Sequence, residues 1–293
     1  MNILLTGGSG FIGRNILGSN LAEKYNISAP TRQQLDLTDE DATAKYFSEN
    51  NTDIVIHAAG KPGHRNAKDP ANIYYSDMRM FLNLLRNEGL YKKMIILGSG
   101  AIYDQRFDVI KAKEDDDNKH LPIDEHALYR YTVHRMIAGK RNIVELRIFG
   151  IFGKYEDYAI RFISNAICKT LFDLPITIKQ NRKFDYLYID DLMPILDYFI
   201  SHESKFNVYN VTPGQPVELK ELAEMVKEIS GKNLPVKIAQ KGMGLEYSGS
   251  NFRLKKEIKN LYLTPIGQAI RDLYIWYSEH KNTLTKELLA KDK

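Results

Sequence analysis

The chain has 293 residues, 43% of them hydrophobic, which is typical of one large or two small globular domains. The net charge of +4 is modest and no basic stripe alternates with aromatic residues, so nucleic acid is not expected as a partner. No apolar run reaches the length of a membrane span, and the single cysteine, Cys168, excludes an internal disulfide. We expect a cytoplasmic protein with no signal peptide, no membrane partner and no bound metal.

The first predicted strand, residues 2–5, leads directly into a glycine-rich turn and then into a helical pattern. In such a strand–turn–helix, Gly7 permits a tight turn, Gly10 lets backbone N–H groups approach a phosphate, and Gly13 lets the helix pack against the strand. The positive end of the helix dipole then faces the anion. The start of the chain therefore predicts a pyrophosphate site for a dinucleotide rather than an ordinary glycine-rich loop.

Apolar strands alternate with helical patterns in the first half of the chain, which predicts a parallel sheet covered by helices on both faces. After the first unit we expect strands at residues 27–29, 53–57, 94–97 and 143–147 and helices at residues 41–48, 70–88 and 125–138. Beyond Gly153 the alternation stops, although residues 184–189 and 208–211 are expected to return to the sheet. We predict an α/β fold: a Rossmann-type, doubly wound parallel sheet in residues 1–153 with return segments at about 184–212, and a smaller mixed substrate-binding part in residues 154–183 and 213–293.

The end of the second predicted strand separates NAD from NADP, because an NAD site usually offers a carboxylate to the adenosine ribose there. This chain has Ala29–Arg32 at that point, without an acidic residue. An arginine neutralises a 2′-phosphate, so Arg32 favours NADP(H), with Arg14 as a second candidate. Asp36 is placed to accept a hydrogen bond from the adenine amino group. The alternative is that both arginines are surface groups and that NAD is the cofactor.

Five stretches together resemble the extended short-chain dehydrogenases/reductases that act on nucleotide-activated sugars. They are Gly7–Gly13, Asp36–Leu37, His57–Gly60, Leu97–Tyr103 and Arg182–Asp191. Within that family, residues 32–37 and 97–99 are most similar to the GDP-fucose synthase type, which implies an NADPH-dependent reaction on a 4-keto-6-deoxy sugar. The resemblance also implies which residues contact the cofactor: Gly7, Gly10, Phe11, Ile12, Gly13, Arg32, Asp36, Leu37, Ala58, Ala59 and Gly60.

Members of this family exchange a proton through a tyrosine whose pKa is lowered by a lysine four residues later, while a Ser or Thr holds the same oxygen. The resemblance aligns Ser99 with the hydroxyl and Tyr129 with the tyrosine, which leaves Val133 where the lysine belongs. A shifted register instead makes Tyr131 the acid and Arg135 the cation, at the same four-residue spacing. Both registers stay open, as does a chain that binds both ligands but turns over weakly.

Further departures from the family pattern reduce the number of reactions that this chain is expected to catalyse. Family dehydratases have an Asp-Glu pair directly after the hydroxyl, where this chain has Gly100 and Ala101. Ala101 also replaces the cysteine that the GDP-fucose synthase type uses to epimerise carbons 3 and 5. Gly150 replaces an asparagine that usually contacts the sugar. Plain hydride exchange is therefore the expected reaction.

Arginines are expected to bind the diphosphate of the substrate. Arg182 matches a family arginine, Arg161 and Arg253 are further candidates, and Ser99 and Ala101 are expected beside the sugar; the alternative is that these arginines form exposed salt bridges. The expected function is an NADPH-dependent reductase of a nucleotide-diphosphate sugar carrying a 4-keto (deoxy) group, in surface polysaccharide biosynthesis. The alternatives are an epimerase that keeps NAD(P) tightly bound and a catalytically weakened binding protein. The resemblance also implies a homodimer.

Overall fold

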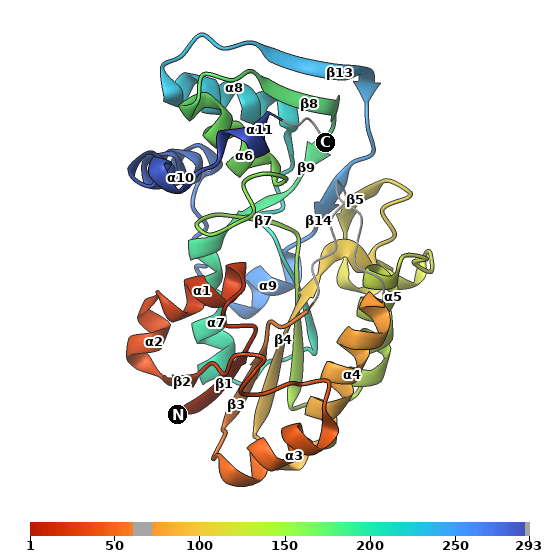
Figure 1. Ribbon diagram of the computed structural model, residues 1–293. Helices are drawn as coiled ribbons and strands as arrows, with labels where there is room; N and C mark the ends of the chain where they lie inside the picture. Colours follow the sequence, from red (N-terminus) through yellow and green to blue (C-terminus); the bar gives the residue numbers. More distant parts are fainter. Residues whose placement is uncertain (61–71, 291–293) are drawn as a thin grey trace.

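The computed structural model describes residues 1–60 and 72–290, and a six-stranded parallel sheet forms the lower half of the molecule in the view of Figure 1. The strand order is β11-β6-β4-β3-β1-β2, and every neighbouring pair is parallel. The strands are β1 (Asn2–Thr6), β2 (Asn26–Ser28), β3 (Ile54–His57), β4 (Lys93–Ser99), β6 (Ile143–Ile148) and β11 (Val208–Val211). The predicted α/β, Rossmann-type fold is confirmed.

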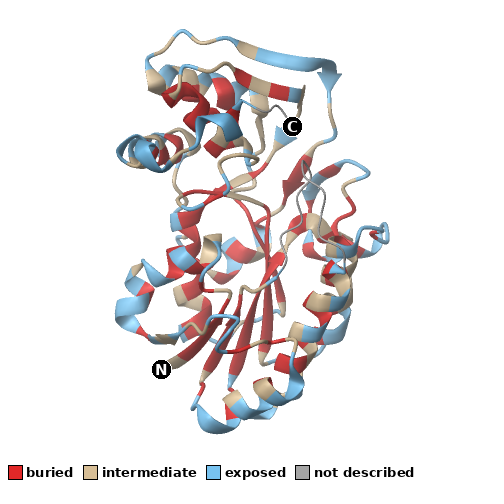
Figure 2. Ribbon diagram, viewed as in Figure 1, coloured by how far each residue is buried: buried red, intermediate tan, exposed pale blue. Residues whose placement is uncertain are grey.

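Helices cover both faces of this sheet because successive strand residues point to opposite sides. Ile3 and Leu5 of β1 pack in one hydrophobic cluster, and Leu4 packs in another. The first cluster is covered by α1 (Phe11–Leu17), α2 (Asn20–Lys24), α7 (Leu192–Ser201) and α9 (Phe252–Glu257). The second is covered by α3 (Glu40–Glu49), α4 (Ile73–Arg86) and α5 (Glu125–Ile137). Figure 2 shows the strands as the most continuously buried part of the chain.

The upper half in Figure 1 is built from small sheets and helices. Its pairs are β7 (Gly150–Phe152) with β10 (Tyr186–Tyr188) and β8 (Ile176–Asn181) with β13 (Val236–Met243), and its four-stranded sheet joins β12 (Val217–Glu218), β9 (Lys183–Phe184), β14 (Tyr247–Gly249) and β5 (Val109–Ala112). Its helices are α6 (Phe162–Leu171), α8 (Leu219–Ser230), α10 (Ile266–Glu279) and α11 (Lys286–Leu289). The 3₁₀ turns of the chain are η1 (Glu88–Leu90), η2 (Gly100–Ile102), η3 (Glu114–Asn118), η4 (Ile189–Asp191) and η5 (Lys281–Thr283).

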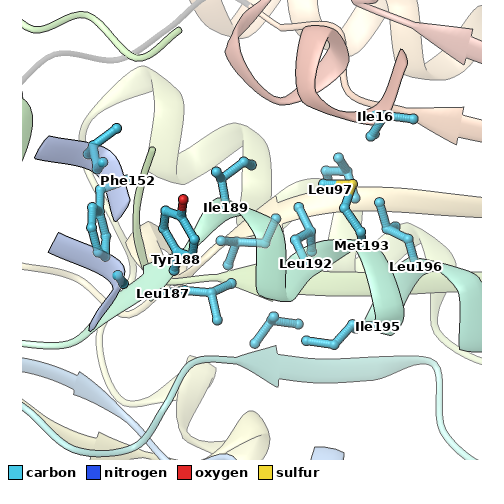
Figure 3. Close-up of a cluster of buried hydrophobic side chains, with 14 of the residues drawn as sticks. Ile16, Leu97, Phe152, Leu187, Tyr188, Ile189, Leu192, Met193, Ile195 and Leu196 are labelled. Carbon is cyan, nitrogen blue, oxygen red and sulfur yellow. The ribbon is translucent and has the colours of Figure 1, made fainter. Parts of the chain in front are cut away.

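One expected return to the main sheet is corrected by this topology. Residues 208–211 do join the six-stranded sheet as β11, whereas residues 184–189 do not. Tyr186 pairs instead with Gly150, beyond the end of β6, and the following apolar residues turn back toward the main sheet. Figure 3 shows Leu187, Ile189 and Leu192 continuing into α7 beside Leu97, so one hydrophobic cluster connects both halves of the molecule.

The order of the strands determines where a ligand has room. From β1 the chain moves outward to the edge strand β2, and it then crosses back to β3 on the other side of β1. The connections after β1 and β3 therefore diverge, which leaves a crevice at the carboxyl ends of these two strands in doubly wound sheets. Among the described residues, no helix combines the length and apolar character needed to cross a bilayer.

Candidate functional site

The turn after β1 is formed by backbone that has no space for side chains. Gly7 has φ +74°, and a Cβ there would lie 2.8 Å from the Ala58 carbonyl. A Cβ on Gly13 would lie 2.2 Å from the carbonyl oxygen of Gly7, and the Gly10 N–H donates to that same oxygen at 3.0 Å. Because Gly13 lets α1 approach the turn this closely, the residues present fit the phosphates of a dinucleotide, which need bare backbone at close range.

The buried Thr6 hydroxyl forms hydrogen bonds that connect this turn to the end of β3. Thr6 Oγ1 accepts hydrogen bonds from the N–H groups of Ala58 and Ala59 at 3.2 and 3.1 Å and lies 2.9 Å from His57 Nδ1. Since the hydroxyl accepts twice, its own proton is donated to Nδ1, which places the His57 proton on Nε2. Burial, with a further contribution from the Arg130 charge, lowers the pKa of His57 to about 3, so His57 is a neutral packed residue.

Arg32 and Asp36 lie together after β2. The Arg32 guanidinium is exposed and donates to Asp36 Oδ2 at 3.3 and 3.4 Å, while Asp36 Oδ1 accepts from the Thr38 backbone and hydroxyl at 2.9 and 2.7 Å. These bonds lower the pKa of Asp36, with Thr38 as the larger cause and Arg32 as the smaller. Arg14 lies elsewhere, with its guanidinium 3.8 Å from the centre of the Tyr155 ring. Arg32 is therefore the cation that the structure leaves exposed at this turn.

Ser99 ends β4, and its Oγ accepts the Ala101 N–H at 3.1 Å. The next residue, Gly100, begins η2, which packs against α5. A Cβ on Gly100 would lie 2.5 Å from the Tyr247 hydroxyl oxygen and 3.0 Å from the Phe149 ring. Because the space beside Gly100 is filled by these rings, no acidic side chain fits directly after Ser99.

Tyr129 is a core residue in this structure, in contrast to the register that makes it the acid. It is fully buried, together with Val133 and Ile137, in the hydrophobic cluster between the sheet and α4. Its hydroxyl has no hydrogen-bond partner among the described residues, and burial raises its pKa. A phenol in this position is shielded from a substrate that reaches Ser99.

The alternative pair, Tyr131 and Arg135, lies on another face of α5. Tyr131 is half-buried and packs against the cluster that contains Ile102, Tyr103 and Phe149, and Arg135 is exposed. At about 100° of helical rotation per residue, Tyr131 and Arg135 lie about 100° and about 140° around α5 from Arg130, which faces the sheet. The structure therefore does not bring Arg135 to the carboxyl edge of the sheet.

Arg130 is the cation that sequence reasoning missed. Its Nη1 donates to the Leu97 carbonyl oxygen at 3.0 Å, near the end of β4. A Cβ built on Gly60 would lie 3.9 Å from Arg130 Nη2 and 3.4 Å from Oδ2 of the fully buried Asp77. The sequence signal was the helical period: Val133 and Ile137 share a face, and the same stripe extends back to Arg130.

The three predicted substrate arginines lie in different surroundings. Arg182 is half-buried, its guanidinium lies 5.5 Å from the centre of the Phe184 ring, and burial lowers its pKa. Arg161 is exposed and directly precedes α6. Arg253 is bound to Asp115 at 3.0 Å and to Glu114 at 3.7 Å, so acidic partners already occupy it.

An aromatic ring replaces the missing asparagine at Gly150. A Cβ on Gly150 would lie 2.4 Å from Cε1 of Phe184, so the Phe184 ring fills the place of a side chain there. Phe184 and Tyr247 lie with their ring centres 4.8 Å apart, and Tyr247 continues the stack to Phe149 at 5.0 Å. The wall beside Ser99 and Arg182 is therefore aromatic.

Comparisons with known proteins agree with this geometry. The profile of the "NAD dependent epimerase/dehydratase family" matches residues 3–212. GDP-L-colitose synthase of Yersinia pseudotuberculosis is 24% identical over 260 residues, which cover 79% of this chain and 82% of that protein. A probable GDP-L-fucose synthase of Oryza sativa subsp. japonica is 21% identical over 302 residues, covering 95% of this chain and 92% of that protein.

Solved structures show the same fold. GDP-mannoheptose C4 reductase of Campylobacter jejuni, solved with NADP bound, superposes with a TM-score of 0.79 at 21% identity, covering 94% of this chain and 98% of that one. UDP-glucose 4-epimerase of Thermotoga maritima, solved with UDP-glucose, gives 0.79 at 20% identity, covering 96% and 100%. Because the family profile spans most of the chain and includes the glycine turn, this protein belongs to the NAD dependent epimerase/dehydratase family.

Proposed function

We propose that this protein is an NADPH-dependent reductase of a nucleotide-activated 4-keto (deoxy) sugar that serves surface polysaccharide biosynthesis in the cytoplasm. The observation that carries the reductase assignment is the packing around Gly100. Removal of water or inversion of a carbon next to a ketone needs a side chain that takes and returns a proton there. The positions directly after Ser99 are Gly100, closed by Tyr247 and Phe149, and Ala101, and neither has a titratable group.

The turn after β1 and the end of β3 would hold the cofactor. Gly7, Gly10 and Gly13 would present bare backbone to the pyrophosphate, with the first residues of α1, Phe11 and Ile12, beside it. The ends of the strands would complete the site with Leu37, Ala58, Ala59 and Gly60. When bound, the reduced dinucleotide supplies a hydride to the carbonyl carbon.

NADPH is the preferred cofactor in this proposal because β2 ends without a carboxylate. Residues 26–35 contain no acidic side chain, and Arg32 is exposed and, among the described residues, forms an ion pair with Asp36. A 2′-phosphate can replace Asp36 as the partner of Arg32, whereas a 2′-hydroxyl cannot use that charge. Asp36 is then available to the adenine amino group.

The upper half would bind the sugar nucleotide. Residues 1–153 with 184–212 would form the cofactor part, and residues 154–183 with 213–293 the substrate part. Arg182 is half-buried beside aromatic rings, which suits one phosphate of a nucleotide-diphosphate sugar, and the exposed Arg161 is a second cation. Arg253 is left out because acidic residues bind it. Exposed Tyr75 on α4 and Met136 on α5 support a homodimer through these helices.

The similar proteins support the substrate class. Two sequence relatives are GDP-L-colitose and GDP-L-fucose synthases, others are epimerases of UDP- and ADP-linked sugars, and one structural neighbour is a GDP-mannoheptose C4 reductase with NADP bound. The test follows the absorbance of NADPH with a panel of nucleotide-linked 4-keto sugars. Consumption of NADPH in proportion to one keto sugar supports the proposal. A protein that purifies with bound cofactor and interconverts two sugars without net consumption contradicts it.

A further inference from the structure

The stripe of α5 that faces the sheet changes from apolar to polar as it reaches the carboxyl edge of the strands. Ile137 and Val133 are buried in the core, and one turn before Val133 the stripe continues with Arg130 and then with His126. His126 and Arg130 are four residues apart, so they lie on one face of the helix, about 40° apart. Both are half-buried, unlike the exposed Arg135.

The hydrogen bond of Arg130 shows where this polar pair lies along the direction of the strands. Its Nη1 donates to the carbonyl oxygen of Leu97, so the Arg130 guanidinium is level with Leu97. His126 lies one helical turn, about 6 Å, further along the axis. Ser99 lies two strand residues, about 7 Å, beyond Leu97. Since α5 packs on β4 and η2, these two rises place His126 at about the level of Ser99.

We propose, resting on the reductase function above, that His126 donates the proton to the substrate carbonyl oxygen and that Arg130 holds the nicotinamide ribose. The carbonyl carbon gains a hydride, the former π pair takes a proton from a ring N–H of the His126 imidazolium, and neutral imidazole remains, to be reprotonated by water. Ser99 donates a hydrogen bond to the same oxygen. Arg130 keeps its charge throughout and orients; it does not relay the proton.

Charge near this end of α5 comes from several elements. Arg130 and Glu125 lie on α5 itself, buried Asp77 lies on α4, and buried His57 lies on β3. Asp77 Oδ2 and Arg130 Nη2 approach the same point beside Gly60, so the carboxylate offsets the guanidinium charge. Residues 100–102 of η2 add no titratable side chain.

The pH dependence distinguishes an imidazole from a phenol. Free imidazole titrates at about pH 6.5 and free phenol at about pH 10. With His126 as the donor, kcat/KM for reduction falls about tenfold per pH unit on the alkaline side, because the imidazolium disappears there. His126→Tyr restores a phenol four residues before a cation, so its profile stays flat to a higher pH than that of the wild type.

Activity tests compare a variant that should lose the rate with a control that should keep it and with a variant of the rival register. His126→Asn should lower kcat by about 10²-fold or more, with unchanged melting temperature as the folding check. His202→Asn, at the exposed end of α7, is the matched control and should keep the rate. Tyr131→Phe tests the rival register. A His126→Asn variant that keeps both the rate and the alkaline fall, or a Tyr131→Phe variant that alone loses them, overturns the proposal.

Two binding tests do not need turnover. Arg130→Met should raise the Kd for NADPH about 10-fold to 100-fold, measured by the fluorescence of the bound cofactor, with Arg271→Met on α10 as control. The imidazole resonance of His126, assigned by its loss in His126→Asn, should shift when NADP⁺ is added, whereas that of His202 should not. A rise in Kd for Arg135→Met in place of Arg130→Met, or an unmoved His126 resonance in the saturated protein, contradicts the inference.

These outcomes separate this inference from the proposed function. Wild-type protein that binds no dinucleotide overturns both. Protein that binds NADPH and reduces a keto sugar, but is indifferent to His126 and Arg130, overturns this inference alone. Protein that binds NADPH and reduces none of the sugars contradicts the reductase assignment, and the Kd and resonance measurements then decide the placement of His126 and Arg130.

Discussion

The turn after β1 and the first two turns of α5 lie at the same edge of the sheet, but the turn presents backbone groups and the helix presents side chains. The turn presents backbone, and its shape depends on side chains being absent at Gly7 and Gly13. The first turns of α5 present side chains: Arg130 bonds the Leu97 carbonyl oxygen near the end of β4, and His126 lies one helical turn before Arg130. A backbone site tolerates no added atom, whereas a side-chain site can change its chemistry while the helix stays in place.

The largest expected effect is on cofactor binding by the turn after β1, because a side chain at Gly13 would collide with the turn. Gly13→Ala places a Cβ 2.2 Å from the Gly7 carbonyl oxygen, so either the helix or the turn must move. We expect the Kd for NADPH to rise more than about 100-fold, together with a lower melting temperature. Gly267→Ala on α10 is the control, since its Cβ has nothing within 4 Å and the change should stabilise by up to about 1 kcal/mol. Unchanged NADPH binding by Gly13→Ala would show that the turn is not the phosphate site.

Arg32 would contribute to the cofactor site through its side chain and not through backbone. Arg32→Ala should weaken NADPH binding by about 10-fold to 100-fold and leave NADH binding unchanged, because only NADPH carries the 2′-phosphate. Arg86→Ala removes a comparable exposed ion pair, to Glu40 at 2.6 Å, and should change neither Kd. Equal losses for both cofactors in Arg32→Ala would contradict the assigned role.

Charged groups surround the last turn of α5, so we predict that the stability of the protein depends on pH. His134 lies 3.0 Å from Asp117 and 3.4 Å from Glu145. Burial lowers the pKa of His134, but these carboxylates raise it more, so the net pKa is raised. The stability that the charged ring contributes is therefore full below pH about 6.5 and is lost as the pH rises through the raised value.

Denaturant titrations from pH 5 to 9 check this prediction. The free energy of unfolding of the wild type should fall by about 1–3 kcal/mol on the alkaline side, and that of His134→Gln should fall less over the same interval. Burial raises the pKa of Glu145, but Arg147 and His134 lower it more, so titrations extended below pH about 4.5 should show the wild type losing stability there, and His134→Gln losing it through the Arg147 contribution that remains. Parallel curves for the two proteins would show that His134 stays neutral in the folded state.

The smallest effect concerns Tyr129, which separates the core stripe of α5 from its polar end. Its hydroxyl is buried without a partner among the described residues, so Tyr129→Phe should change the free energy of unfolding by less than about 1 kcal/mol, or raise it. Tyr103→Phe is the matched variant: the Tyr103 hydroxyl donates to Asn210 at 2.7 Å and accepts from Arg147 at 2.9 Å. That variant should lose about 1–3 kcal/mol. Equal losses would mean that Tyr129 has a polar partner.

Sequence patterns predicted the parts of the molecule that depend on local periodicity. The alternation of apolar strands and helices gave the parallel sheet, and the glycine spacing gave the turn at Gly7 and Gly13. The first turns of α5, at the carboxyl edge of the sheet, were harder to predict, because Tyr129 with Val133 and Tyr131 with Arg135 have the same spacing as His126 with Arg130. Only the packing of α5 on β4 shows which face meets the sheet.

Long-range pairing was also beyond sequence reasoning. Residues 184–189 have the apolar character of a returning strand, but only Tyr186–Tyr188 of this range pair with Gly150–Phe152, and none of the range joins the main sheet. Arg253 has the chemistry of a phosphate ligand, and its acidic partners come from residues 114–115, far away in the chain. In both cases the role of the segment or residue depends on a distant partner, and the composition does not reveal that partner.

The most direct test of the account is a calorimetric titration of NADPH into the folded wild-type protein. The backbone turn after β1 and the exposed Arg32 predict saturable heat with one site per chain and a weaker response to NADH. Absence of heat with both reduced and both oxidised dinucleotides, on protein with an intact melting transition, would contradict the account.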